Sequence, residues 1–104
     1  MRESRLETFK KYVEKDPDNS FARYSMAMEY RTTGDLAMAL RTFEELVERD
    51  PAYVPAYLMA GHVAAALGET EKAEAVLARG IEAAAKAGNQ HAASEMSELL
   101  ESLR

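Results

Sequence analysis

The chain has 104 residues, a formal net charge of -5, and neither cysteine nor tryptophan. A chain of this length forms one domain with a hydrophobic core of its own, and the absence of cysteine excludes thiol catalysis, cysteine-ligated zinc and redox switching. Its 47% hydrophobic and 30% charged residues are ordinary for a globular protein, and its acidic balance disfavours a nucleic-acid partner.

Six helices are predicted, and the sequence indicates an all-α fold. The residues between the prolines and glycines are mostly good helix formers, and no stretch alternates apolar and polar residues as a strand does. Asn19 or Ser20, Asp35 and Asn89 stand where they can accept hydrogen bonds from the free N–H groups of a helix start. In chain order, the predicted helices span residues 3–15, 19–32, 36–49, 53–66, 70–87 and 89–102.

The N-terminal residues lead directly into an amphipathic pattern and lack the continuous apolar stretch of a secretory signal. Charged residues interrupt each hydrophobic segment before it reaches the roughly 18 to 20 residues of a membrane span. We therefore expect a soluble, cytoplasmic protein without a membrane partner.

The sequence contains an internal repeat with a period of 34 residues. Four independent pairs of anchors share this one period, which indicates a repeated structural unit. The pairs are Asp16-Pro17 with Asp50-Pro51, Gly34-Asp35 with Gly68-Glu69, Ala39 with Ala73, and Phe43 with Leu77.

The period and these residues resemble the tetratricopeptide repeat, a 34-residue pair of antiparallel helices. The resemblance implies a single domain over residues 1–104, in which helix-turn-helix repeats stack as a short right-handed α-solenoid. About two full units lie between flanking capping helices. The implied parts are an N-terminal half-repeat at 1–17, full repeats at 20–53 and 54–87, and a capping helix at 89–104.

Two departures from the repeat pattern carry structural expectations. Arg23 stands where the first unit usually has a large apolar residue. Ala85 replaces the proline that would end the second unit, so we expect that unit's second helix to run past its usual end, toward Gly88.

In this family the first helices of successive units line a concave groove that binds extended peptides. The spacing of Phe21, Tyr24, Met28 and Arg31 places them on one stripe of a helix, separate from the packing stripe. The equivalent stripe of the next such helix contains Leu58 and His62, with Met59 at its edge. The candidate partner-binding groove therefore consists of Phe21, Tyr24, Met28, Arg31, Leu58, Met59 and His62.

The alternative for these residues is that they pack beneath the N-terminal or the final helix, as apolar stripes at helical spacing usually do. All eight aromatic residues lie between Phe9 and Tyr57, so any binding anchors are expected in the first unit. The Lys, Asn and Arg set with which some family members hold a peptide's C-terminal carboxylate is absent from this row, which disfavours that mode of binding.

Catalysis and metal binding find little support in the sequence. His62 and His91 are 29 residues apart, and neither belongs to a zinc motif. We interpret His62 as a groove or packing residue and His91 as a surface residue. The sequence thus predicts no enzyme activity, no cofactor and no metal site.

The densest acidic group is Glu44, Glu45 and Glu48, and at helical spacing it is typical of a solvated face. Arg41 or Arg49, three or four residues away, are the expected ion-pair partners.

Two functions remain open. The first is a small interaction scaffold or adaptor that binds a peptide or a helix of a partner protein in the concave groove. The alternative is a structural unit that forms a homodimer through its exposed apolar surface, because two-fold dimers are the commonest oligomers.

Overall fold

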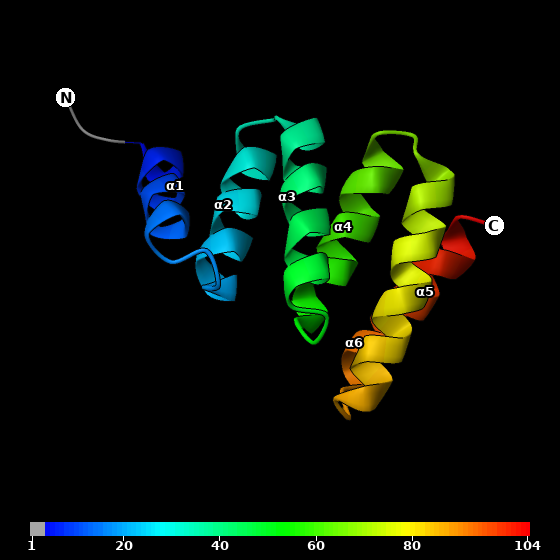
Figure 1. Ribbon diagram of the computed structural model, residues 1–104. Coiled ribbons are helices and arrows are strands. Elements are labelled where there is room, and N and C mark those ends of the chain that lie inside the picture. The colour runs from blue at the N-terminus through cyan, green and yellow to red at the C-terminus, as the bar shows by residue number, and fades with distance from the viewer. Residues whose placement is uncertain (1–3) are drawn as a thin grey trace.

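The computed structural model describes residues 4–104, which form six α-helices and no strand. Figure 1 shows α1 to α5 side by side in chain order, with α6 behind α5, in a body that measures 46 × 28 × 19 Å. The helices are α1 (Arg5–Lys15), α2 (Ser20–Thr32), α3 (Leu36–Arg49), α4 (Val54–Ala66), α5 (Thr70–Lys86) and α6 (Gln90–Ser102). The predicted all-α helical-repeat solenoid is confirmed, and residue 3, where the first helix was predicted to begin, lies outside the described residues.

The helix starts use the capping residues that the sequence indicated. The side chains of Asn19, Asp35 and Asn89 accept hydrogen bonds from backbone N–H groups three residues further on, at the starts of α2, α3 and α6. Ser4 caps α1 in the same way, through the N–H of Glu7. Because these bonds satisfy otherwise free N–H groups, α1, α2, α3 and α6 each have a defined beginning.

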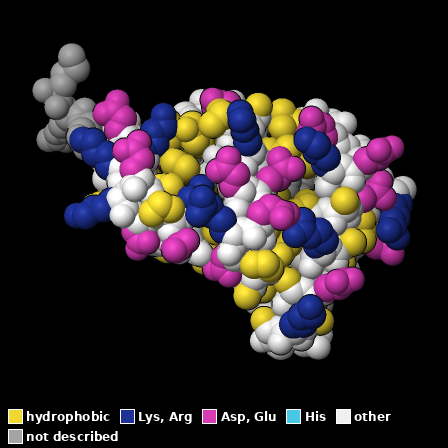
Figure 2. Space-filling view, in the orientation of Figure 1, with side chains coloured by type: hydrophobic (Ala, Val, Ile, Leu, Met, Phe, Trp, Pro, Cys, Tyr) yellow, Lys and Arg dark blue, Asp and Glu magenta, His cyan; other side chains and the backbone are white. Residues whose placement is uncertain are grey.

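The acidic group on α3 forms ion pairs with neighbouring helices. Glu45 lies 3.1 Å from the guanidinium of Arg23 on α2, and Glu48 lies 3.2 Å from that of Arg79 on α5. The predicted pairing of this group with Arg41 or Arg49 is wrong: Glu45 and Glu48 pair with arginines of α2 and α5, and Arg49 pairs with Asp18 at 3.7 Å. Figure 2 shows acidic and basic side chains interleaved over the face turned toward the viewer.

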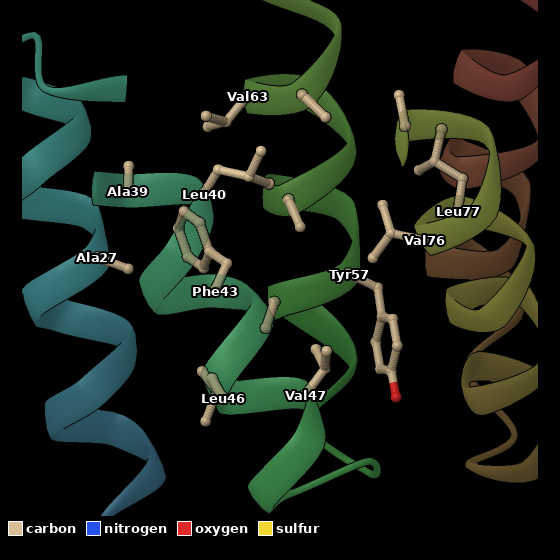
Figure 3. Close-up of a cluster of buried hydrophobic side chains, with 14 of the residues drawn as sticks. Ala27, Ala39, Leu40, Phe43, Leu46, Val47, Tyr57, Val63, Val76 and Leu77 are labelled. Atoms are coloured by element: carbon tan, nitrogen blue, oxygen red, sulfur yellow. The ribbon is translucent and has the colours of Figure 1, made fainter. Parts of the chain in front are cut away.

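The core consists of side chains from α2, α3, α4, α5 and α6. Phe43 of α3 and Leu77 of α5 are fully buried. Figure 3 shows Ala27 of α2 facing Phe43, and Leu77 pointing toward α4. Fully buried alanines, among them Ala27 and Ala39, let adjacent helices approach closely, since a larger side chain would hold them apart.

Arg23 is buried at the position where the repeat usually has a large apolar residue, and only 5% of it is exposed. One guanidinium nitrogen donates to Glu45, and the other donates to the carbonyl oxygen of Pro17 at 3.1 Å. Burial lowers the pKa of Arg23 from its usual range, as does the charge of Arg49, and the two nearby carboxylates act in the opposite direction. Arg23 thus joins α2 to α3 and to the loop that precedes α2.

The long helix predicted at the second unit is confirmed. α5 contains 17 residues, whereas its counterpart α3 contains 14. The chain leaves α5 through Gly88, whose φ of +70° suits glycine, and the N–H of Asn89 donates to the carbonyl of Ala84 at 2.8 Å. As a result α6 begins 36 residues after α4, although α4 begins 34 residues after α2.

Candidate partner-binding site

Two helices carry the candidate residues. On α2 the buried residues include Met26, Ala27 and Tyr30, so the stripe from Phe21 to Arg31 lies on a different side of the helix. On α4 the partly buried pair Leu58 and Met59 and the exposed His62 supply the second row. We call the surface formed by these two rows the α2–α4 face; its members are Phe21, Tyr24, Met28, Arg31, Leu58, Met59 and His62.

One end of the α2–α4 face is aromatic. The ring of Tyr24 contacts Phe43 edge-on at 5.7 Å between centroids and lies 5.5 Å from the ring of Tyr53, the residue that precedes α4. Next to this pair on α2, Phe21 is 68% exposed, the most exposed large hydrophobic residue in the described part of the chain. Phe21 is not among the hydrophobic residues that pack against the core, so its ring is accessible to another molecule.

Both tyrosines at this end are partly withdrawn from water. Burial raises the pKa of Tyr24, and the positive charge of Arg31 partly offsets that rise. Burial also raises the pKa of Tyr53, with smaller contributions from Tyr24 and Asp50. The phenols therefore stay neutral and can donate hydrogen bonds at the rim of an apolar surface.

The other end of the α2–α4 face is polar. Arg31 of α2 and His62 of α4 line one hollow of about 370 Å³ near the ends of their helices. The remaining lining residues are Leu36, Val63 and Ala66, so no acidic side chain lines it. Between the two ends, Met28, Leu58 and Met59 are partly buried against the core.

The alternative for the residues of the α2–α4 face is that α1 or α6 covers them. Phe21, Arg31 and His62 are exposed, so neither α1 nor α6 covers them. Tyr24 is partly buried because it packs on Phe43 and Tyr53, which belong to the middle of the chain.

Tyr53 was missed as a candidate because it lies outside both helical stripes. The available signal was the concentration of aromatic residues in the first 57 positions, to which Tyr53 belongs. A loop residue has no periodicity, so only the fold reveals that it contacts Tyr24.

The second histidine and the acidic residues form no further site in the described residues. His91 is a surface residue, 88% exposed at its side chain, and lies 3.0 Å from Glu95 one turn along α6. Residues 4–104 contain no group of three or more histidine, aspartate or glutamate side chains placed to hold a metal ion. None of the helices in this part of the chain combines the length and the apolar character that crossing a membrane requires.

Family models and solved structures identify the class of protein. One model described as tetratricopeptide repeat matches residues 30–96, and a second with the same description matches residues 8–41. The chain therefore belongs to the tetratricopeptide repeat family. A comparison with curated protein sequences gives no match.

Three solved structures illustrate the similarity. A tetratricopeptide repeat domain protein from Salinibacter ruber is 37% identical, with a TM-score of 0.80 over 86% of this chain and 90% of that one. The TPR2B domain of yeast Sti1, in a complex with pHsp70, is 18% identical, with a TM-score of 0.87 over 94% and 78%. The Yersinia enterocolitica type III secretion chaperone SycD, in complex with a peptide of the translocator YopD, is also 18% identical, with a TM-score of 0.85 over 94% and 76%.

Proposed function

We propose that this chain is a protein-interaction scaffold that binds a peptide or a helix of a partner protein on the α2–α4 face. The observation that carries the proposal is the exposed ring of Phe21, one turn before Tyr24 on α2, together with the contact between Tyr24 and Tyr53. Aromatic side chains with a buried base and an accessible edge are typical anchors of protein interfaces.

The dimensions of the face limit what it binds. Phe21 and Arg31 are ten residues apart on α2, which corresponds to about 15 Å at a rise of 1.5 Å per residue. An extended peptide covers that length with about four or five residues. The proposed partner therefore contributes a short segment, and its affinity depends on a few anchors.

The structural relatives support binding as the general function of this fold. The Sti1 domain is described in complex with pHsp70, and SycD in complex with a peptide of the translocator YopD. At 18% identity they share the fold with this chain, so the residues that bind are argued here from the α2–α4 face alone. We also propose 20–53 and 54–87 as the two full repeats, and no catalytic role.

The test uses peptides of about 12 residues, long enough to cross the face, selected from a displayed random library on the full chain. We expect Phe21→Ser with Met28→Ser to weaken binding of selected peptides at least about tenfold, with the helical circular dichroism unchanged. Tyr12→Ser is the matched control, because Tyr12 is a 54% exposed aromatic on α1.

Retained binding in the Phe21/Met28 variant, or equal loss in the control, would contradict the proposal. Light scattering of the chain alone adds a second outcome. A dimer that dissociates on Phe21→Ser would assign the same surface to self-association in place of peptide binding.

A further inference from the structure

We propose that the segment bound on the α2–α4 face carries an acidic side chain, which Arg31 and His62 receive, four or five residues from the apolar side chain that contacts Phe21 and Tyr24. This inference rests on the proposed function and adds the chemistry and the spacing of the ligand.

The first support is the way in which arginines are paired in this protein. Within residues 4–104, the arginines that pair with a carboxylate are Arg5, Arg23, Arg49, Arg79 and Arg104. Arg31, like Arg41, makes no such pair in that part of the chain. Its described electrostatic partner is the phenol of Tyr24, two turns back on α2 and on the same stripe, so its charge acts along the proposed binding surface.

The second support is that Arg31 does not stand alone. His62 comes from a different helix and lines the same hollow, together with Leu36, Val63 and Ala66. A guanidinium donates several hydrogen bonds in a plane, and an imidazole donates at least one in either protonation state. Two donor side chains from two helices that line one hollow without an acidic lining residue match a carboxylate.

The position of Arg31 in the last turn of α2 has a simpler explanation, because a cation there interacts favourably with the helix dipole. That explanation does not account for His62, which lies four residues before the end of α4. It also makes a different prediction: replacing Arg31 would change the stability of α2 and leave the preference between acidic and neutral ligands unchanged.

The donor set favours a side-chain carboxylate over a chain end. No asparagine or glutamine lines the hollow. Amide side chains of the kind that can enclose a terminal carboxylate are therefore lacking among the lining residues.

The spacing follows from the helix. The aromatic end and the hollow are about 15 Å apart along α2, and about four or five residues of extended peptide span this distance. A ligand that satisfies both ends thus combines one large apolar residue with Asp or Glu at that separation.

The experiment compares matched peptides on matched proteins. A fluorescein-labelled peptide selected on the full chain is made with Glu and with Gln at the acidic position, and each is titrated against wild type, Arg31→Gln and His62→Gln. Arg41→Gln is the control, because Arg41 is an exposed arginine on α3 that also lacks a carboxylate partner in the described residues.

We expect the Glu peptide to bind wild type about tenfold more tightly than the Gln peptide. Arg31→Gln is expected to remove most of this difference, His62→Gln to reduce it, and Arg41→Gln to leave it intact. Sequences of selected peptides are expected to show Asp or Glu four or five positions from a large apolar residue.

The inference is overturned if Glu and Gln peptides bind wild type equally, or if their difference persists in Arg31→Gln. Loss of binding on amidation of the peptide's C-terminus, without loss on Glu→Gln, would assign the hollow to a chain end and also overturn it. If Phe21→Ser abolishes binding while Arg31→Gln does not affect it, the proposed function stands and the inference fails. If Phe21→Ser has no effect or no peptide is enriched, both fail.

Discussion

Gly80 of α5 packs so closely on Tyr57 of α4 that a β-carbon at position 80 would lie 2.5 Å from the β-carbon of Tyr57. Real β-carbons do not approach this closely, and the backbone-proximal atom of Tyr57 cannot turn away. The side chain of Met96, from α6, meets the same point. The packing of α4, α5 and α6 therefore depends on the absence of a side chain at position 80.

Gly80→Ala is expected to destabilise the protein, although alanine is the better helix former. The gain in helix propensity is about 1 kcal/mol, whereas overpacking costs about 1–3 kcal/mol. We expect a cost at the upper end of that range, because both Tyr57 and Met96 must be displaced. Thermal unfolding measures the difference. Ala78→Gly, at an exposed position of α5, supplies the propensity contribution alone. An unchanged or higher melting temperature for Gly80→Ala would contradict the close contact.

Ala39→Leu should lower the melting temperature clearly. Ala39 of α3 is fully buried, so a leucine must displace a neighbouring helix, at a cost of about 1–3 kcal/mol. For a domain of this size each kcal/mol corresponds to roughly 4–8 °C. Ala37→Leu is the control, because Ala37 is exposed and lies two residues before Ala39 on the same helix. This substitution should leave the melting temperature nearly unchanged.

Two substitutions of Arg23 separate its packing from its hydrogen bonds. Arg23→Ala removes both the buried stem and the bonds to Glu45 and Pro17, and we expect a loss of about 2–3 kcal/mol in urea unfolding. Arg23→Met keeps an apolar stem of similar length and leaves Glu45 able to reach water, so about 1 kcal/mol is expected. Equal losses for the two variants would show that the stem contributes little.

The raised pKa values of Tyr24 and Tyr53 predict a specific loss of stability at alkaline pH. Below about pH 10 both phenols are protonated in the folded and the unfolded chain, and their contribution to the free energy of unfolding is fully present. Above it the unfolded chain releases these protons first, so stability falls as the pH rises through the folded-state pKa values.

Thermal melts at a series of pH values above neutrality measure this loss, and Tyr24→Phe with Tyr53→Phe should make the melting temperature fall less steeply. Tyr12→Phe, at an exposed tyrosine, controls for removal of a hydroxyl. An identical pH profile for wild type and the double variant would contradict the assignment.

Ala85→Pro restores the residue with which the repeat usually ends, yet we expect it to be harmful here. Position 85 lies inside α5, so proline removes a helical hydrogen bond and collides with the preceding turn, at a cost of about 3 kcal/mol. Ala85→Gly keeps the N–H group and should cost about 1 kcal/mol. Similar losses for the two variants would mean that the last turn of α5 contributes little to stability.

The helices of this fold were predictable because their signals are local. Asn19, Asp35 and Asn89 cap helices through N–H groups only three residues away, and the length of α5 followed from a single missing proline. The period of 34 residues supplied the arrangement of the helices, since each one contacts mainly its neighbours in the chain.

Contacts between helices were not predictable in the same way. Arg23 finds its partners at Pro17 and Glu45, and Glu48 finds Arg79 31 residues away. Which charged side chains pair across a packed interface depends on how the two helices are placed. Spacing in the sequence indicates only which side chains are close along a single helix. For the same reason the candidate site lacked Tyr53, which contacts Tyr24 from a loop.

α1 has no buried residue and packs chiefly on α2. In a linear stack each helix is held by its neighbours, so the free energy of local opening is smallest at such an end and largest near α3 and α4. Amide hydrogens of α1 are accordingly expected to exchange with solvent well before global unfolding. The aromatic end of the α2–α4 face, anchored on Phe43 in α3, belongs to the slowly exchanging part and keeps its shape while α1 opens and closes.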